Sequence, residues 1–435
     1  MIKSVIVNIS RLLLSLTFLF SGFVKAVDPL GTQYKLEDYA AAMGLDGIFP
    51  TWLFLCGSVA MSALEVMIGI QLLFAINRRI ISKLALLFML VMTGLTVWIY
   101  LADPVEDCGC FGDAIKLTNG ETLMKNIVML ACAVIVTLWP KKMPRMVSLS
   151  NQWIVFHYSL VFIIAVSVYC IHFLPIFDFR PYHIGANIPE GMEIPEGAEQ
   201  PVFETTFIME KDGKQEEFTV DNYPDSTWTF IDSKTKLIKA GYEPPIHDFF
   251  LQDHEGDDIT DAVLSRPGYT LLLITPNLEV ADDTNFGHLN AIYDYAQQQK
   301  VPFYCLTASE DGAIQHWIDI TGAEYPFVKC DGLTLKTMVR SNPGLMLLKE
   351  GTVAAKWSNN NLPAFDAASK LQAFDKTDTY DAHNKQMWLY ILLWYVLPLA
   401  LLVLADRTWH IFNTLSTRYN FKKNHKTHEK ENCSR

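Results

Sequence analysis

Two cysteines separated by a single glycine are the residues of this sequence best suited to chemistry; they lie in the run Asp107-Cys-Gly-Cys-Phe-Gly-Asp113. Thiols so close together can alternate between a dithiol and a disulfide, and exchange proceeds by thiolate attack through a mixed disulfide. A Cys-Gly-Cys disulfide closes a very small ring, so we expect a strained, easily reduced bond. Gly109 permits the sharp bend that such a ring needs. Cys108 and Cys110 are therefore predicted to be a redox-active, catalytic pair.

Other interpretations of Cys108 and Cys110 stay open. They could form a static disulfide, or each could bond to another cysteine. A metal site needs further ligands and no histidine is near in the sequence, so no metal is expected. Cys56 is a candidate relay partner for the pair, although a cysteine in an apolar stretch is more often a small packing residue.

The elements that must position these thiols are apolar stretches long enough to cross a membrane, which takes about 20 residues. The first is expected to be a retained helix, because no small-residue cleavage site follows it. The six stretches are Val5–Ala26, Trp52–Ile76, Ile80–Leu101, Leu123–Trp139, Trp153–Leu174 and Met387–Leu404.

Basic residues predict the orientation, because cytoplasmic loops are enriched in lysine and arginine. With six spans, the basic segments all fall on one side; they contain Lys3, Arg78, Arg79, Lys141, Lys142, Arg145, Arg407, Arg418, Lys422 and Lys423. We therefore expect a multi-pass protein of the inner (plasma) membrane with both termini cytoplasmic. The cysteine loop and the long segment 175–386 then lie on the periplasmic or extracellular side. The net charge of −12 argues against a nucleic-acid partner. The expected partners are the lipid bilayer and extracytoplasmic proteins.

Three motifs in the first 140 residues occur together: Gly22-Phe-Val-Lys-Ala-Val-Asp-Pro29, Ala63-Leu-Glu-Val-Met-Ile-Gly69 and the Cys-Gly-Cys run. On these motifs the region resembles the MauE/DoxX-like family of four-helix membrane proteins. The resemblance implies a helical bundle and a role in extracytoplasmic thiol–disulfide exchange or in maturation of envelope proteins. Methylamine utilisation is a label of the family only. No cofactor is predicted, and nothing in the sequence supports a quinone.

Charged residues within the apolar stretches require partners, because an unpaired charge in a membrane is costly. We expect Arg11 and Glu65 to form a structural intramembrane pair. Proton or quinone chemistry at Glu65 is the alternative. Lys25 is expected to reach the outer headgroups near Asp28.

The segment 175–244 is predicted to be a β-rich linker. Ile-Pro-Glu-Gly occurs twice, at Ile188 and Ile194, which is typical of turns. Alternating residues on either side of Asp212 and Gly213 predict a hairpin.

Residues 245–373 resemble a thioredoxin-like domain. The pattern predicts strands at 269–275 and 301–307, helices at 282–300 and 312–321, and a proline at 343 before a terminal hairpin, which is an α/β alternation. Pro343 resembles the cis-proline of that fold. Where a thioredoxin has Cys-x-x-Cys, this chain has Thr275-Pro-Asn-Leu-Glu-Val280, without cysteine. We therefore expect a binding module with Asn277 and Pro343 at its binding surface. Cys305 is expected to be buried packing.

The expected fold is thus a membrane α-helical bundle, with a four-helix core plus two further helices, that carries an extracytoplasmic α/β thioredoxin-like domain lacking Cys-x-x-Cys. Its predicted parts are 1–140, 153–174, 175–244, 245–373, 387–404 and a basic cytoplasmic tail at 405–435. Two functions follow: a component of thiol–disulfide exchange with protein clients or thiol-redox partners, or a non-enzymatic scaffold that binds through the α/β domain. A transporter has little support, because the stretches show no inverted repeat.

Overall fold

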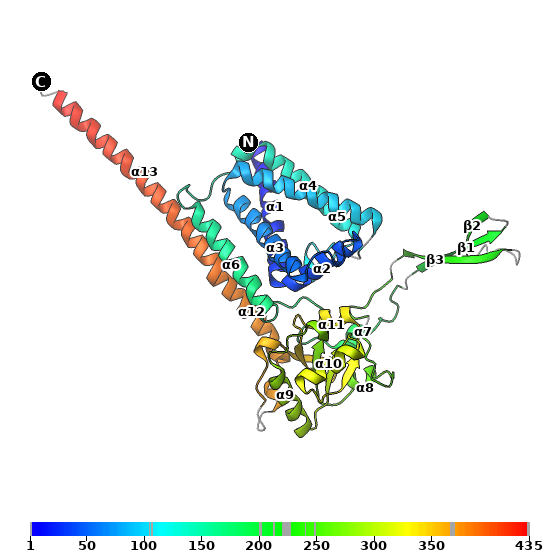
Figure 1. The fold of residues 1–435 in the computed structure, drawn as a ribbon. Coiled ribbons are helices and arrows are strands. Elements are labelled where there is room, and N and C mark those ends of the chain that lie inside the picture. Colours follow the sequence, from blue (N-terminus) through cyan, green and yellow to red (C-terminus); the bar gives the residue numbers. More distant parts are fainter. Residues whose placement is uncertain are drawn as a thin grey trace.

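The computed structural model describes residues 2–103, 105, 108–199, 202–211, 214–219, 228–239, 241–247, 249–365 and 370–432. These residues form a helical bundle, an α/β domain at one end of the bundle, and a small sheet that stands apart from both (Figure 1).

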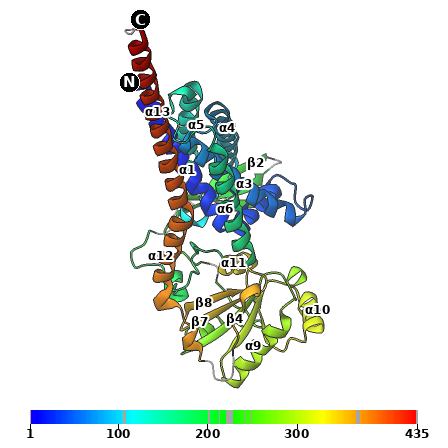
Figure 2. The ribbon, with the colours of Figure 1, turned by 90° about the vertical axis from the view of Figure 1, so that its left-hand side faces the viewer.

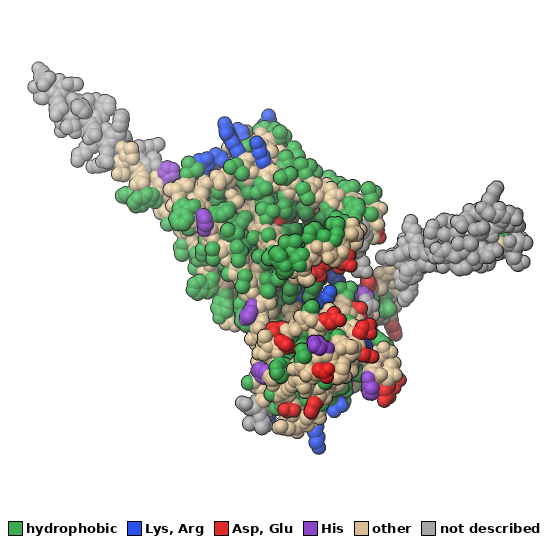
Figure 3. Space-filling view, viewed as in Figure 1, with side chains coloured by type: hydrophobic (Ala, Val, Ile, Leu, Met, Phe, Trp, Pro, Cys, Tyr) green, Lys and Arg blue, Asp and Glu red, His purple; other side chains and the backbone are tan. Residues whose placement is uncertain are grey.

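Six helices of the described chain are long and apolar enough to cross a membrane, which confirms the predicted number of spans. Their outward surfaces are largely apolar, as a lipid-facing surface must be (Figure 3). The first five are α1 (Ile2–Val27), α3 (Thr51–Phe74), α4 (Arg78–Ala102), α5 (Asn119–Leu138) and α6 (Gln152–His172). The sixth is a continuous run of α12 (Tyr380–Ile391), the π-helical turn η8 (Leu392–Val396) and α13 (Leu397–Asn432), so the predicted basic tail is helical as far as Asn432.

Helices α1 and α3 pack closely because glycines face the other helix at their contact. A Cβ atom on Gly22 would lie 2.8 Å from the backbone oxygen of Ser62, and one on Gly69 would lie 3.0 Å from that of Ser15. Small residues are what allow such close packing between membrane helices. Helices α4 and α5 complete a four-helix group, and α6 joins this group to the sixth span, where Tyr395 Oη of η8 donates to Ser159 Oγ at 2.9 Å.

The segment after α1, which lies between the first two predicted spans, contains a helix, α2 (Pro29–Ala42), that was not predicted from the sequence. Asp28 caps it by accepting a hydrogen bond from the Gly31 amide at 2.9 Å, and Pro29 occupies the first helical position. Both are favourable at a helix N-terminus. Helix α2 lies across the end of the bundle that faces the α/β domain (Figure 1).

The α/β domain contains a five-stranded sheet in the order β6-β5-β4-β7-β8 (Figure 2). Strands β4 (Tyr269–Thr275), β5 (Phe303–Thr307) and β6 (Phe327–Lys329) are parallel. Strands β7 (Gly344–Lys349) and β8 (Thr352–Ser358) run antiparallel and form the predicted hairpin. The peptide bond between Asn342 and Pro343 is cis, as the sequence predicted.

Both faces of this sheet are covered, and the side chains of β4 alternate between them. Leu271 and Leu273 pack against α9 (Phe286–Gln298) and α10 (Asp311–Thr321). Leu272 and Ile274 pack against α11 (Gly332–Met338), α8 (Thr260–Leu264) and α7 (Ile188–Met192). Cys305 of β5 is fully buried, as expected, and burial raises the pKa of its thiol to about 12.

The segment that precedes the small sheet belongs to the core of the α/β domain, although the sequence placed all of 175–244 in a linker. Tyr182 and Ile188 are buried in that core, and the Ile188 amide donates to the Gly351 oxygen at 2.9 Å. Beyond it, β1 (Val202–Lys211), β2 (Lys214–Thr219) and β3 (Thr229–Lys239) pair in the order β2-β1-β3. The β1–β2 hairpin was predicted, and its turn residues 212 and 213 lie outside the described residues. Short 3-10 turns occur at Gly112–Ala114 (η1), Pro140–Lys142, Leu278–Val280, Asn359–Asn361, Leu371–Ala373 and Thr377–Thr379.

Candidate functional site

Cys108 and Cys110 lie in the loop between α4 and α5, at the end of the bundle that faces the α/β domain. Both are free thiols, and their Sγ atoms are 3.0 Å apart. Both are nearly buried, with 6% and 8% of their surfaces exposed. A disulfide requires about 2.05 Å between the sulfurs, so only a small movement separates this dithiol from a bond. The two predicted cysteines thus lie side by side without a bond between them, and their redox activity stays a prediction.

The loop is held in place by the helices beneath it. Gly109 has a φ of +61°, a conformation that suits glycine, and the Gly112 amide donates back to the Gly109 oxygen at 3.1 Å. Tyr39 Oη of α2 donates to the Cys108 oxygen at 2.7 Å. Ser21 Oγ of α1 donates to the Cys110 oxygen at 2.6 Å. These bonds hold the backbone of both cysteines against α1 and α2.

The two thiols are electrostatically different. The hydrogen bond from Cys108 lowers the pKa of Cys110 to about 6, against the effect of burial and with help from Lys125 and Lys25. The same bond raises the pKa of Cys108. Lys125 lies over the neighbouring Phe111 ring, with its Nζ 4.1 Å from the ring centroid. Because the thiolate is the attacking species, the direction of these two shifts favours Cys110 as the nucleophile.

Beneath the loop, Glu65 of α3 pairs with Lys25 of α1. The Nζ–Oε1 distance is 2.7 Å, and the two side chains are only 4% and 2% exposed. The predicted Arg11–Glu65 pair is therefore wrong, as is the expectation that Lys25 reaches the headgroups. Arg11 is buried near the other end of α1 and donates to the Pro144 oxygen at 3.3 Å.

Helix length explains the error. Ser58 Oγ donates to the Pro29 oxygen at 2.7 Å, so the first two turns of α3 extend past the end of α1. The expected Arg11–Glu65 pair assumed that Glu65 lies deep in the membrane, a depth that follows only if α3 begins level with the end of α1. Arg11 and Lys25 are 14 positions apart on α1, which corresponds to about 21 Å. Glu65 lies at the level of Lys25.

A small cavity of about 30 Å³ lies beside this ion pair and Cys110. One water molecule needs about 10–15 Å³ of such volume, whereas pockets for small organic ligands are on the order of 300–1,000 Å³. The cavity therefore has room for water. Polar groups of α1, α3, α5 and the cysteine loop line it. Its lining is Leu14, Thr17, Phe18, Ser21, Lys25, Glu65, Phe88, Met89, Met92, Cys110, Phe111, Lys125, Asn126 and Met129.

Cys56 lies on an exposed face of α3, in contrast to the buried pair. Its part in a relay stays a prediction. Among the described residues, no group of three or more histidine, cysteine, aspartate or glutamate side chains could hold a metal ion.

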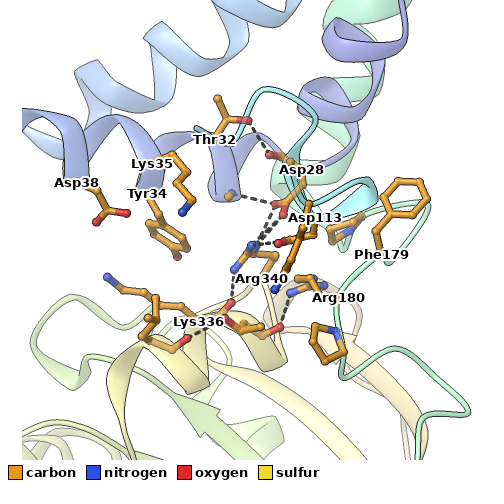
Figure 4. Close-up of a pocket in the computed structure, with 18 of the residues that line it drawn as sticks. Asp28, Thr32, Tyr34, Lys35, Asp38, Asp113, Phe179, Arg180, Lys336 and Arg340 are labelled. Atoms are coloured by element: carbon orange, nitrogen blue, oxygen red, sulfur yellow. Dashed lines mark hydrogen bonds and ion pairs between the residues drawn. The ribbon is translucent and has the colours of Figure 1, made fainter. Parts of the chain in front are cut away.

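A wider cleft of about 630 Å³ separates the bundle from the α/β domain, and Gly109 forms part of its wall. Figure 4 shows Arg340 of the domain reaching across it to Asp28 at the start of α2. Arg340 donates to both oxygens of Asp28 at 2.9–3.0 Å, and its Nη2 lies 3.5 Å from an oxygen of Asp113. Burial opposes the charge on Arg340, but Asp28 outweighs it and raises the pKa of the guanidinium. This ion cluster joins the domain to the cysteine loop.

A second buried ion cluster supports the same side of the domain. Asp178 accepts from Arg180 Nε at 2.7 Å and from Lys356 Nζ at 2.8 Å. Arg180 Nη1 also donates to the Thr337 oxygen at 2.9 Å, at the end of α11. The three buried cations of these two clusters, Arg340, Arg180 and Lys356, are therefore all paired with aspartates. No feature of the sequence indicated either cluster, because the partners are far apart in the chain.

Asn277 and Pro343, predicted to form a binding surface, are brought together. The side-chain amide of Asn342 donates to the Asn277 oxygen at 2.7 Å. Asn277 caps the short turn after β4, where its side chain accepts from the Glu279 amide at 2.8 Å. Neither residue lines the cleft, although Arg340 lies only three positions before Pro343.

Comparisons with known proteins bear on two parts of the chain. Residues 3–139 match the family model described as methylamine utilisation protein MauE. This match confirms the predicted resemblance of the N-terminal third to MauE. Residues 203–240, which include β1 to β3, match a domain of unknown function, DUF8463. No curated protein matches the chain. The six apolar helices indicate a multi-pass membrane protein, and the N-terminal third of the chain is similar to MauE.

Proposed function

We propose that this protein takes part in thiol–disulfide exchange on the extracytoplasmic side of the membrane, with Cys110 as the attacking thiol and Cys108 as the resolving thiol. The observation that carries the proposal is the pair of free thiols 3.0 Å apart, held at the end of the bundle beside the docked α/β domain. The difference between the two pKa values supports the assignment of roles, since one sulfur is favoured as thiolate and the other as thiol.

Electrons and protons balance when the cysteine pair reduces a disulfide of a client protein. The Cys110 thiolate forms a bond to one client sulfur, and the client's S–S bond breaks as its other sulfur leaves with the electron pair and takes up a proton. Cys108 then loses its proton and attacks Cys110, which releases the first client sulfur as a thiol. The client gains two electrons and two protons, and Cys108–Cys110 becomes the disulfide. The reverse sequence oxidises a client dithiol.

The arrangement of charge supports an extracytoplasmic site. Arg78, Arg79, Lys141 and Arg145 gather at the end of the bundle away from the α/β domain, where Figure 3 shows blue side chains. Because cytoplasmic loops are enriched in such residues, we place that end and both termini in the cytoplasm. The cysteine loop and the α/β domain then face the periplasm or the cell exterior, where disulfides persist.

The α/β domain fits the role of a thioredoxin-like client-binding module. Its strand order, the helix α9 after β4 and the cis-proline before β7 support that resemblance. The turn after β4 carries Asn277 and no cysteine, so the thiols would come from the bundle and the binding surface from the domain.

Trapping tests the proposal. A Cys108→Ser variant keeps the nucleophile and lacks the resolving thiol, so it should accumulate mixed disulfides with envelope proteins that disappear on reduction. The Cys110→Ser variant is the matched control and should accumulate far fewer. The alternative, a scaffold with structural cysteines, is favoured by the burial of both sulfurs, and it predicts adducts in neither variant. Their absence from both variants would overturn the proposal.

A further inference from the structure

The buried ion pair beneath the cysteine loop is connected to that loop by hydrogen bonds. Lys25 Nζ contacts Glu65 Oε1 at 2.7 Å and also donates to Ser21 Oγ at 2.9 Å. Ser21 in turn donates to the Cys110 oxygen at 2.6 Å. A continuous polar chain thus leads from Glu65, through Lys25 and Ser21, to the backbone of the reactive cysteine.

The second carboxylate oxygen of Glu65 has no hydrogen-bond partner among the described protein atoms, although the side chain is 2% exposed. A buried oxygen of this kind is costly unless something satisfies it. Glu65 and Cys110 both line the cavity of about 30 Å³, which has room for one or two water molecules at about 10–15 Å³ each. Water there would connect the carboxylate with the thiol.

We propose that the Lys25–Glu65 pair is the positioning and proton-transfer unit of Cys110, in which Lys25 stabilises the thiolate and Glu65 accepts the thiol proton through the cavity. This inference rests on the proposed thiol–disulfide exchange and assigns two further residues to it. When a protonated Cys110 ionises to become the attacking thiolate, its Sγ–H bond breaks, the electron pair stays on sulfur, and the proton passes to Glu65. Glu65 then returns it to the client sulfur that leaves.

The charged and titratable groups around Cys110 come from every element that packs against it. They are Lys25 of α1, Glu65 of α3, Lys125 of α5 and Cys108 of the loop itself. From α4, the cavity is lined by uncharged Phe88, Met89 and Met92. On α2, Tyr39 bonds to the Cys108 oxygen and Lys35 lies against Gly109. Lys25 and Glu65 act on the Cys110 thiolate in opposite directions, since one lowers and the other raises its pKa.

This opposition gives a test that separates an electrostatic role from a structural one. The rate of Cys110 alkylation in the reduced full-length protein is measured against pH, with the modified peptide followed by mass spectrometry. Lys25→Met should raise the midpoint pH of alkylation by about one unit, and Glu65→Gln should lower it by a similar amount. The double variant should return close to the wild-type midpoint. Loosened packing would move both single variants in the same direction.

Arg11→Met is the matched control, because it removes another buried cation from α1 at the opposite end of the helix, and it should leave the midpoint unchanged. If Lys25→Met does not fold, the Glu65→Gln variant alone tests the inference. Only an electrostatic role of Glu65 predicts that removal of its charge lowers the midpoint pH of Cys110 alkylation. Equal or absent shifts in the two single variants would overturn the inference. If Cys108→Ser still traps clients in that case, the proposed function stands without this inference. Opposite shifts without any trapping would refute the function and the proton-transfer role that rests on it, and would leave only the electrostatic effect of the ion pair on Cys110.

Discussion

Removal of the Arg340 side chain should release the α/β domain from the bundle without unfolding either part. Arg340 is 6% exposed and Asp28 is 19% exposed, and the two form three contacts of 2.9–3.0 Å. Removing one partner of a buried pair costs about 3–5 kcal/mol, because the other charge stays buried without compensation. Asp28 keeps some access to water, so we expect about 3 kcal/mol for Arg340→Met, the lower end of that range. That corresponds to roughly a 100-fold weaker docking equilibrium.

The assay is amide hydrogen exchange on the full-length protein in a membrane mimic. In Arg340→Met, protection should fall in α2, in η1 and in the segment 175–182, while β4 and α3 keep wild-type protection. The double variant Asp28→Asn/Arg340→Met should recover part of the loss, because it leaves no unpaired charge at Asp28. Lys329→Met serves as the control. Lys329 pairs with Asp311, whose side chain is 95% exposed, and surface pairs of this kind contribute little.

Two results would refute this reasoning. Wild-type protection throughout Arg340→Met would mean that the ion cluster does not hold the domain. A loss that is larger in the double variant than in the single one would mean that the cost does not come from an unpaired charge at Asp28.

Three further predictions follow from the same geometry. Against the effect of burial, Arg340 holds the pKa of Asp28 below its usual range, so the docking energy of this ion pair is present above about pH 4 and should be lost as the pH falls through the folded pKa of Asp28. Hydrogen exchange at low pH would detect the loss, and unchanged docking well below that pH would contradict the prediction. Gly109→Ala would place a Cβ atom 3.2 Å from Lys35 Cγ at a residue whose φ is +61°. The substitution should therefore cost about 1–2 kcal/mol of loop stability and change the alkylation rate of Cys110. An unaltered rate would show that the substitution does not strain the loop. External protease should cleave the α/β domain in intact spheroplasts but spare a tag on the C-terminus, and the opposite pattern would reverse the proposed orientation.

Hydropathy was enough to predict the six spans, because a membrane helix needs a run of apolar residues that few soluble elements have. The sheet of the α/β domain was also predictable, since β4 and β5 are buried runs of the usual length and Pro343 precedes a hairpin. Helix α2 was missed although Asp28 and Pro29 are ordinary start signals, because its sequence lacks an apolar periodicity.

The partners within the candidate site were less predictable than its cysteines. The Cys-Gly-Cys spacing is local, so it fixed the pair without knowledge of the fold. The partner of Glu65 depends on how far α3 extends past α1, which no sequence pattern records. Arg340 and Asp28 are 312 positions apart and meet only because the domain folds back onto the end of the bundle.

Redox titration of the purified full-length protein tests the central claim most directly. The protein would be equilibrated in glutathione buffers of defined potential, and the peptide that carries Cys108 and Cys110 would be examined by mass spectrometry for the loss of two hydrogens. A redox-active pair should interconvert reversibly, with a midpoint less negative than about −300 mV, the region below which structural disulfides lie. A pair that stays bonded, or stays free, across the whole accessible range would contradict the account.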